Sequence, residues 1–106
     1  MIQGVKIKNL QLHRDVPDTQ QPEVPPGFLM EVLRADENLL KKFGQSTMTV
    51  AYAGMIKGFH SHERQEDLWF MATGRAGVVL YDLRPDSPTY KQTAVVYAGA
   101  DDYKLI

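Results

Sequence analysis

The sequence predicts a small all-β protein, built as a sandwich or barrel of short antiparallel strands. Two observations lead to this fold class. Short segments rich in Val, Ile, Thr and Tyr recur at a spacing of about 8–12 residues, and clusters of Gly, Pro, Asp and Ser separate them. Hydrophobic residues make up 43% and charged residues 24% of the 106 residues, which is typical of a folded domain. We therefore expect one domain over residues 1–106.

The N-terminal part begins with a strand and a proline-rich arm. Residues 5–12 alternate between apolar side chains and lysines, which is the period of a strand with one buried face. Residues 13–26 are rich in Pro, Asp and Gln, and proline lacks the N–H that a strand ladder needs. We interpret 13–26 as a loop or extended arm, and 27–34 as a second strand.

One short helix is expected near residues 37–43. Asp36 is a favourable N-cap residue, an apolar stripe follows it, and Gly44 is typical of the position just after a helix. From residue 45 onward the pattern is again that of strands separated by turns. The expected strands cover 46–53, 55–62, 68–72, 77–83, 93–97 and 103–106.

Charge and composition argue against several classes of partner. The formal net charge is −1 and the longest run of cationic residues is Lys41–Lys42, so the stripe of cations that nucleic acid requires is missing. No run of 18 apolar residues is present, and we expect no membrane span. The sequence contains no cysteine, which excludes disulfides and thiolate chemistry and fits a cytoplasmic protein.

The run GFHSHERQED holds the candidate chemistry of the chain. His60 and His62 are two residues apart, so on a strand both imidazoles would point to one face. Glu66 has the same parity, and two imidazoles with a carboxylate form a ligand set for Zn, Fe or Mn. A pair of half-exposed histidines beside a charged turn is the alternative. The row from Gly54 through these three residues to Gly74 resembles the first motif of the cupin superfamily, in which the two His and the Glu bind metal.

A second resemblance covers more of the chain. Its segments, in chain order, are GFLMEVLR (27–34), FGQS (43–46), IKGFH (56–60), GVVLYDLR (77–84) and SPTY (87–90). In these segments the sequence resembles the dTDP-4-dehydrorhamnose 3,5-epimerase family, whose members are cupin jelly rolls that epimerise a 4-keto-6-deoxy sugar nucleotide without a metal. The resemblance spans about residues 27–90 and implies that the second half of the barrel lies beyond Ile106.

The resemblance implies roles for individual residues. His60 falls on the catalytic base, which removes a proton from the carbon beside the keto group, and imidazole suits a base that works near neutral pH. Phe28, Glu31 and Gln45 fall on substrate contacts. Lys57 stands where the family usually has an arginine, which keeps the positive charge but loses a two-pronged contact to phosphate.

Three positions depart from the family pattern. Pro26 replaces an arginine that binds diphosphate, and Thr47 replaces an asparagine. Asp67 stands where the family has a lysine that stabilises the enolate, and a carboxylate there would repel such an anion.

Two other functions stay open beside the epimerase. His60 and His62 together resemble the His-x-His run of dTDP-sugar 3,4-ketoisomerases, in which one histidine moves a proton between neighbouring carbons. A non-catalytic module for binding or assembly is the other. The expected small molecule is a nucleotide sugar, with no cofactor in the epimerase and a divalent metal in the alternative held by His60, His62 and Glu66. Unpaired strand edges and the arm at 13–26 favour a homodimer.

Overall fold

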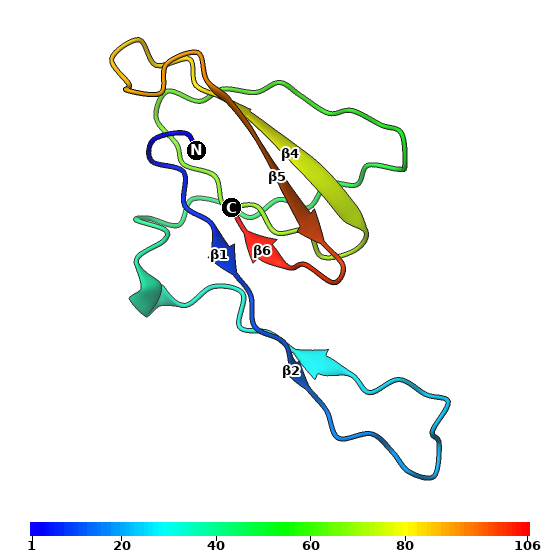
Figure 1. The fold of residues 1–106 in the computed structure, drawn as a ribbon. Coiled ribbons are helices and arrows are strands. Elements are labelled where there is room, and N and C mark those ends of the chain that lie inside the picture. The colour runs from blue at the N-terminus through cyan, green and yellow to red at the C-terminus, as the bar shows by residue number, and fades with distance from the viewer.

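The computed structural model describes residues 1–106, and it is almost entirely β in character (Figure 1). Its strands form three separate antiparallel pairs, β1 with β6, β2 with β3 and β4 with β5. The all-β prediction is confirmed. No helix has the length and hydropathy that crossing a membrane requires. The elements are β1 (Lys8–Asn9), β2 (His13–Arg14), β3 (Phe28–Leu29), the 3₁₀ turn η1 (Ala35–Glu37), β4 (Arg75–Tyr81), β5 (Thr93–Gly99) and β6 (Lys104–Leu105).

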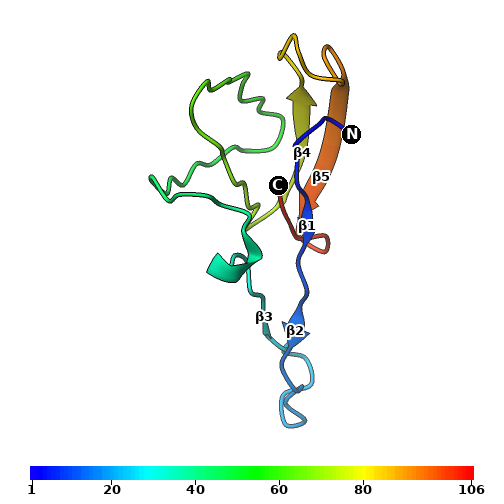
Figure 2. The ribbon, with the colours of Figure 1, turned by 90° about the vertical axis from the view of Figure 1, so that its left-hand side faces the viewer.

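The molecule is elongated, because the β2–β3 hairpin points away from the rest of the chain (Figure 2). The principal extents are 60 × 36 × 25 Å and the radius of gyration is 16.8 Å. A compact chain of this length has a radius of gyration of about 13 Å. The predicted arm at 13–26 is thus a hairpin loop, with β2 at its start and its base closed by the bond from the Asp15 N–H to the Gly27 carbonyl, 2.8 Å long.

The core lies on one face of the β4–β5 hairpin. In this hairpin Val78 is opposite Val96, and because side chains alternate along a strand both point to the same side. Ala98 and Ile106 complete the cluster, and Val5, Met71 and Leu80 pack against it. Ile106 is held there by two backbone hydrogen bonds with Trp69, of 2.9 and 3.1 Å.

A single carboxylate organises the loop between β4 and β5. Asp82 is only 3% exposed and accepts hydrogen bonds from Arg84 Nε at 2.8 Å, Ser87 Oγ at 2.6 Å and Thr89 Oγ1 at 2.6 Å. The same loop holds the N-terminus, since Arg84 donates to the Gln3 carbonyl and the Gln3 N–H donates to Thr89. The Arg84 guanidinium, with help from the two hydroxyls, holds the pKa of Asp82 far below its usual range. The run DLRPDSPT is therefore a loop-stabilising network.

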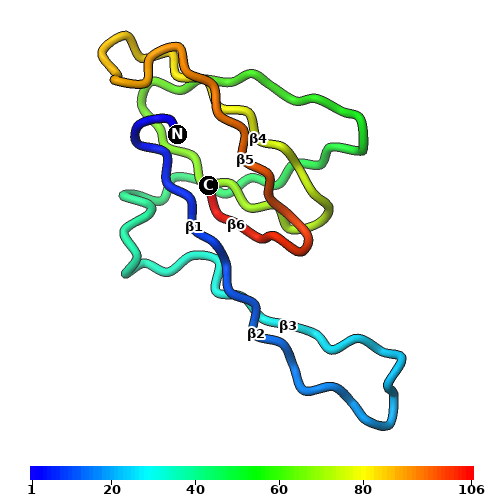
Figure 3. Tube along the Cα trace, viewed as in Figure 1, coloured from blue at the N-terminus to red at the C-terminus, as the bar shows by residue number.

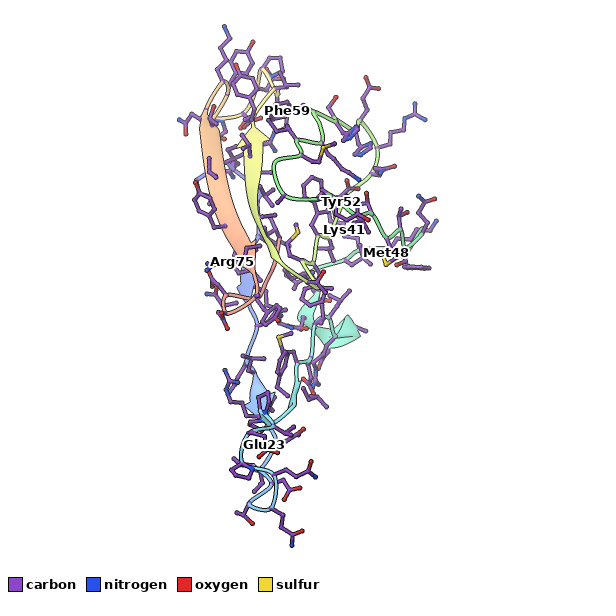
Figure 4. The ribbon with its side chains drawn as sticks, turned by 90° about the vertical axis from the view of Figure 1, so that its right-hand side faces the viewer. Glu23, Lys41, Met48, Tyr52, Phe59 and Arg75 are labelled. Carbon is purple, nitrogen blue, oxygen red and sulfur yellow. The ribbon has the colours of Figure 1, made fainter.

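The segment from Lys41 to Asp67, here called the middle segment, differs from the expectation. It contains no strand, and every residue in it is exposed. The predicted strands 46–53 and 55–62 are wrong for this structure, because no neighbouring strand offers them a ladder of hydrogen bonds. Figure 3 shows this segment as a green loop beside the hairpin, and Figure 4 places Met48 and Tyr52 on it.

Other elements are shorter than predicted or displaced. The strands expected at 5–12 and 27–34 each contain a two-residue strand, and 68–72 contributes one bridge, between Phe70 and Leu105. The helical turn lies at Ala35–Glu37 and shares only Glu37 with the predicted helix at 37–43. It stops at Asn38, which has the left-handed φ of 54°, and a segment this short gains too few helical bonds to continue alone.

Candidate functional site

The two histidines of the candidate site lie on the middle segment and have different surroundings. His60 is exposed and takes part in no hydrogen bond or ion pair. His62 Nε2 lies 3.3 Å from Oδ2 of Asp67, and their side chains are 39% and 35% exposed. The imidazole of His60 therefore has no hydrogen-bond or ion-pair partner, whereas that of His62 contacts a carboxylate.

The Asp67 carboxylate accepts hydrogen bonds from a residue before it and a residue after it in the sequence. Gln65 Nε2 donates to its Oδ1 at 3.1 Å, and Trp69 Nε1 donates to its Oδ2 at 3.4 Å. Trp69 is in turn bonded through its backbone to Ile106 in the core. Asp67 thus stands at the end of the exposed middle segment, and two of its partners, Gln65 and Trp69, are residues that the candidate motif does not single out.

The structure does not assemble the alternative metal site. Glu66 Oε1 lies 3.2 Å from Lys41 Nζ, and His62 contacts Asp67. No group of three or more His, Asp or Glu side chains converges closely enough to hold a metal ion. The trio His60, His62 and Glu66 is therefore not brought together, because residues 60–66 do not form the strand that would align the three side chains on one face.

Two of the expected substrate contacts lie on the same exposed segment as His60. Lys57 Nζ donates to Thr49 Oγ1 at 2.5 Å, across a bend closed by the Met55 N–H to Tyr52 carbonyl bond. Gln45 Nε2 donates to Thr47 Oγ1 at 3.3 Å. These bonds are local, and none of them connects the lysine or the glutamine to His60.

The other two expected contacts lie at or just after β3. The Phe28 ring is 5.8 Å from the ring of Tyr103. Glu31 Oε2 is 3.3 Å from an Arg34 nitrogen, and the Glu31 carbonyl accepts a bond from Lys8 Nζ. Glu31 also lines an open polar cleft of about 380 Å³, which His60 does not line. Its lining residues are Lys8, Asn9, Gln11, His13, Glu31, Arg34, Asp36 and Glu37.

Paired charges stabilise this cleft. Lys8 Nζ binds the Glu37 carboxylate at 2.7 Å and lowers the pKa of Glu37. Hydrogen bonds to Asp36 and then Glu31 raise the pKa of Arg34, and the same Arg34 bond lowers that of Asp36. The sequence analysis missed Lys8 and Asp36 as neighbours of Glu31, and only the nearness of Arg34 in the sequence could have indicated such pairing.

Comparison with known proteins places the chain in a family. The family model for dTDP-4-dehydrorhamnose 3,5-epimerase matches residues 23–105. The chain is 50% identical over all 106 residues to the spore coat polysaccharide biosynthesis protein SpsL of Bacillus subtilis, and spans 64% of that protein. It is 29% identical over 107 aligned positions to the probable low-salt glycan biosynthesis epimerase Agl13 of Haloferax volcanii, and spans 63% of it.

No solved structure gave a significant match to the chain. The family match extends from the loop before β3 to β6 and includes the whole run from Phe28 to Tyr90 in which the family motifs occur in order. On this evidence, the chain belongs to the dTDP-4-dehydrorhamnose 3,5-epimerase family.

Proposed function

We propose that the protein acts on a 4-keto-6-deoxy sugar nucleotide as an epimerase, with His60 as the base that removes a proton from carbon. The observation that carries this proposal is the family match over residues 23–105. The choice of His60 as the base rests on the resemblance of the run IKGFH to the family motif. The names of both relatives add support, since each refers to the biosynthesis of a polysaccharide or glycan.

The proposed chemistry begins with His60. A neutral imidazole takes the proton from a carbon next to the keto group, and the electron pair of that C–H bond moves to the keto oxygen as an enolate. A second group returns a proton to the opposite face and inverts the carbon. The exposed His60 ring, which has no hydrogen-bond or ion-pair partner, supports this role because its lone pair is not already used.

The proposed substrate contacts divide into two groups. Lys57 and Gln45 share the middle segment with His60, where an ammonium group would favour phosphate oxygens. Phe28 and Glu31 come from the region of β3, where a ring and a carboxylate suit the base and hydroxyl groups of a nucleotide sugar. The two groups must come together for the substrate to be held, so the proposal requires the middle segment and the region of β3 to approach each other around the ligand.

Proton exchange tests the proposal directly. We expect the protein in deuterated water to introduce deuterium at C3 and C5 of dTDP-4-keto-6-deoxyglucose, the two carbons that the family description names. His60→Ala should reduce this exchange by at least about 100-fold, the usual contribution of a general base. Met48→Ala, which truncates a side chain that is 89% exposed on the same segment, is the control and should retain exchange. Wild-type protein that exchanges neither carbon would overturn the epimerase assignment.

Two further parts of the proposal have their own tests. The reaction is proposed to need no metal, so exchange should survive dialysis against a chelator.

The protein is also proposed to be a homodimer, supported by large apolar side chains left exposed on the middle segment, of which Ile56 is 89% and Phe59 is 76% exposed. Sedimentation that gives the mass of a single chain would contradict the dimer.

The position of the keto group in the product distinguishes the second candidate function from the epimerase. The second candidate is a 3,4-ketoisomerase, and it is supported by a second imidazole two residues from His60, that of His62, which contacts Asp67. A ketoisomerase moves the keto group to the neighbouring carbon, whereas an epimerase leaves it at C4. The carbon spectrum of the product therefore separates the two reactions.

A further inference from the structure

We propose that Asp67 is a positioning residue, which holds His62 with its Nε2 proton directed at the carboxylate and its Nδ1 lone pair directed away. This proposal rests on the distance of 3.3 Å between His62 Nε2 and Asp67 Oδ2. The inference deepens the proposed function, on which it rests for its chemical meaning, by giving the site a second imidazole with a defined tautomer.

The contacts of Asp67 suit it to this task. Its two oxygens accept from Gln65 and Trp69, so the carboxylate is held from both sides and its orientation is limited. Trp69 is bonded through its backbone to Ile106, at the buried end of the chain. Asp67 consequently connects His62, on a segment with no strand of its own, through Trp69 to Ile106 in the core.

Neighbouring charges do not compete for this role. Glu66 is occupied by Lys41, and Glu63, which adjoins His62 in the sequence, forms no ion pair. Asp67 is thus the one carboxylate that contacts the His62 ring. A carboxylate beside one imidazole nitrogen favours the tautomer with the proton on that nitrogen, which leaves the other as a proton acceptor.

The chemical consequence concerns the proton that moves during the reaction. With its proton on Nε2, His62 can take a substrate proton at Nδ1, and the electron pair of the broken bond stays on the substrate as an enolate. The imidazolium that results then lies beside Asp67, which stabilises the added charge until the proton is returned. No oxidant, reductant or metal enters this step.

Nitrogen NMR of the protein tests the inference without requiring activity. In mildly alkaline buffer, where an ordinary imidazole is neutral, we expect His62 to be almost entirely the Nε2–H tautomer. His60 serves as the reference in the same segment, since it has no partner, and should show a mixture. Asp67→Ala should shift His62 to the His60 mixture, whereas Asp67→Glu should restore the single tautomer. Glu63→Ala, a matched loss of carboxylate, should change nothing.

Two results would overturn the inference. His62 and His60 might show the same mixture in the wild type, or the tautomer of His62 might be unchanged in Asp67→Ala. If Asp67→Ala does not fold, Asp67→Leu keeps a side chain of similar size without any group that can hydrogen-bond the ring, and gives the same readout.

Exchange measurements separate this inference from the proposed function. If wild-type protein exchanges substrate protons, His62→Ala should lower the rate by about 100-fold and Asp67→Ala by about tenfold or more. The double variant should be no slower than His62→Ala alone, because Asp67 acts only through that ring. Wild-type exchange with full activity in Asp67→Ala refutes the role of Asp67. Absence of exchange in the wild type refutes the epimerase while the tautomer measurement still decides the inference.

Discussion

The β4–β5 hairpin and the middle segment divide the molecule into two regions with opposite properties. The hairpin pairs seven residues on each strand, contains Val78, Val96 and Ala98 of the core cluster, and closes with the Asp82 network. The middle segment, residues 41–67, carries both candidate catalytic histidines and has no buried residue. The difference teaches that the strongest family motif, YDLRPDSPTY, contributes stability, whereas the proposed chemistry lies where the chain has no core of its own.

A pair of glycine substitutions should give the largest contrast between the regions. Gly99, at the end of β5, has a φ of 134°, and a Cβ there would lie 2.7 Å from the Arg75 Cα. Gly44 has open space around it. We expect Gly99→Ala to lower the free energy of unfolding by about 3 kcal/mol or more, because both the conformation and the space are unsuitable. Gly44→Ala should be nearly neutral in the same urea titration, and equal losses would remove the distinction.

Replacing one valine in each region by alanine compares the stability of the two regions again, with a smaller expected effect. Val96 is 6% exposed in the core, whereas Val50 is 57% exposed on the middle segment. Val96→Ala should lower the free energy of unfolding by about 2 kcal/mol, from two lost methyl groups and the cavity they leave. Val50→Ala should change it by less than about 0.5 kcal/mol. A large loss for Val50→Ala in solution would mean that the middle segment is covered there.

Acidification should reveal the contribution of the Asp82 network. Because Arg84 and the hydroxyls lower the pKa of Asp82 in the folded state, its stabilisation is complete above the ordinary carboxyl pKa of about 4 and is lost as the pH falls below that value. Asp82→Asn should lower the melting temperature at neutral pH, and the gap from wild type should narrow below about pH 4. Asp86→Asn, which removes an exposed carboxylate from the same loop, is the control. A gap that does not depend on pH would contradict the role of the network.

The prediction from sequence succeeded where the signal was local. Alternation and turn residues predicted strands at 77–83 and 93–97, and the structure places β4 and β5 there with small shifts of their ends. The same kind of pattern at 46–53 and 55–62 predicted strands that the structure lacks. Period-two alternation indicates a face that can be buried, but a strand also needs a neighbour to complete its hydrogen bonds.

For the candidate site, the sequence predicted the residues but not the contacts between them. His60, His62, Glu31 and Lys57 could be chosen from motifs, but the motifs did not indicate which side chains contact one another. Asp67 was interpreted only as an unfavourable replacement for a lysine, whereas in the structure it is the partner of His62. Ion pairs between residues five apart depend on the path of the loop, which no periodicity encodes.

The amino-acid sequence by itself determined the all-β class, the family and the paired strands of the β4–β5 hairpin, because these depend on local alternation and on ordered motifs. Only the tertiary structure decided that Asp82 is a buried acceptor for Arg84, and that Asp67 rather than Glu66 contacts His62. The physical reason is that hydrogen bonds and ion pairs require atoms within about 3–4 Å. The three-dimensional course of the loops sets those distances.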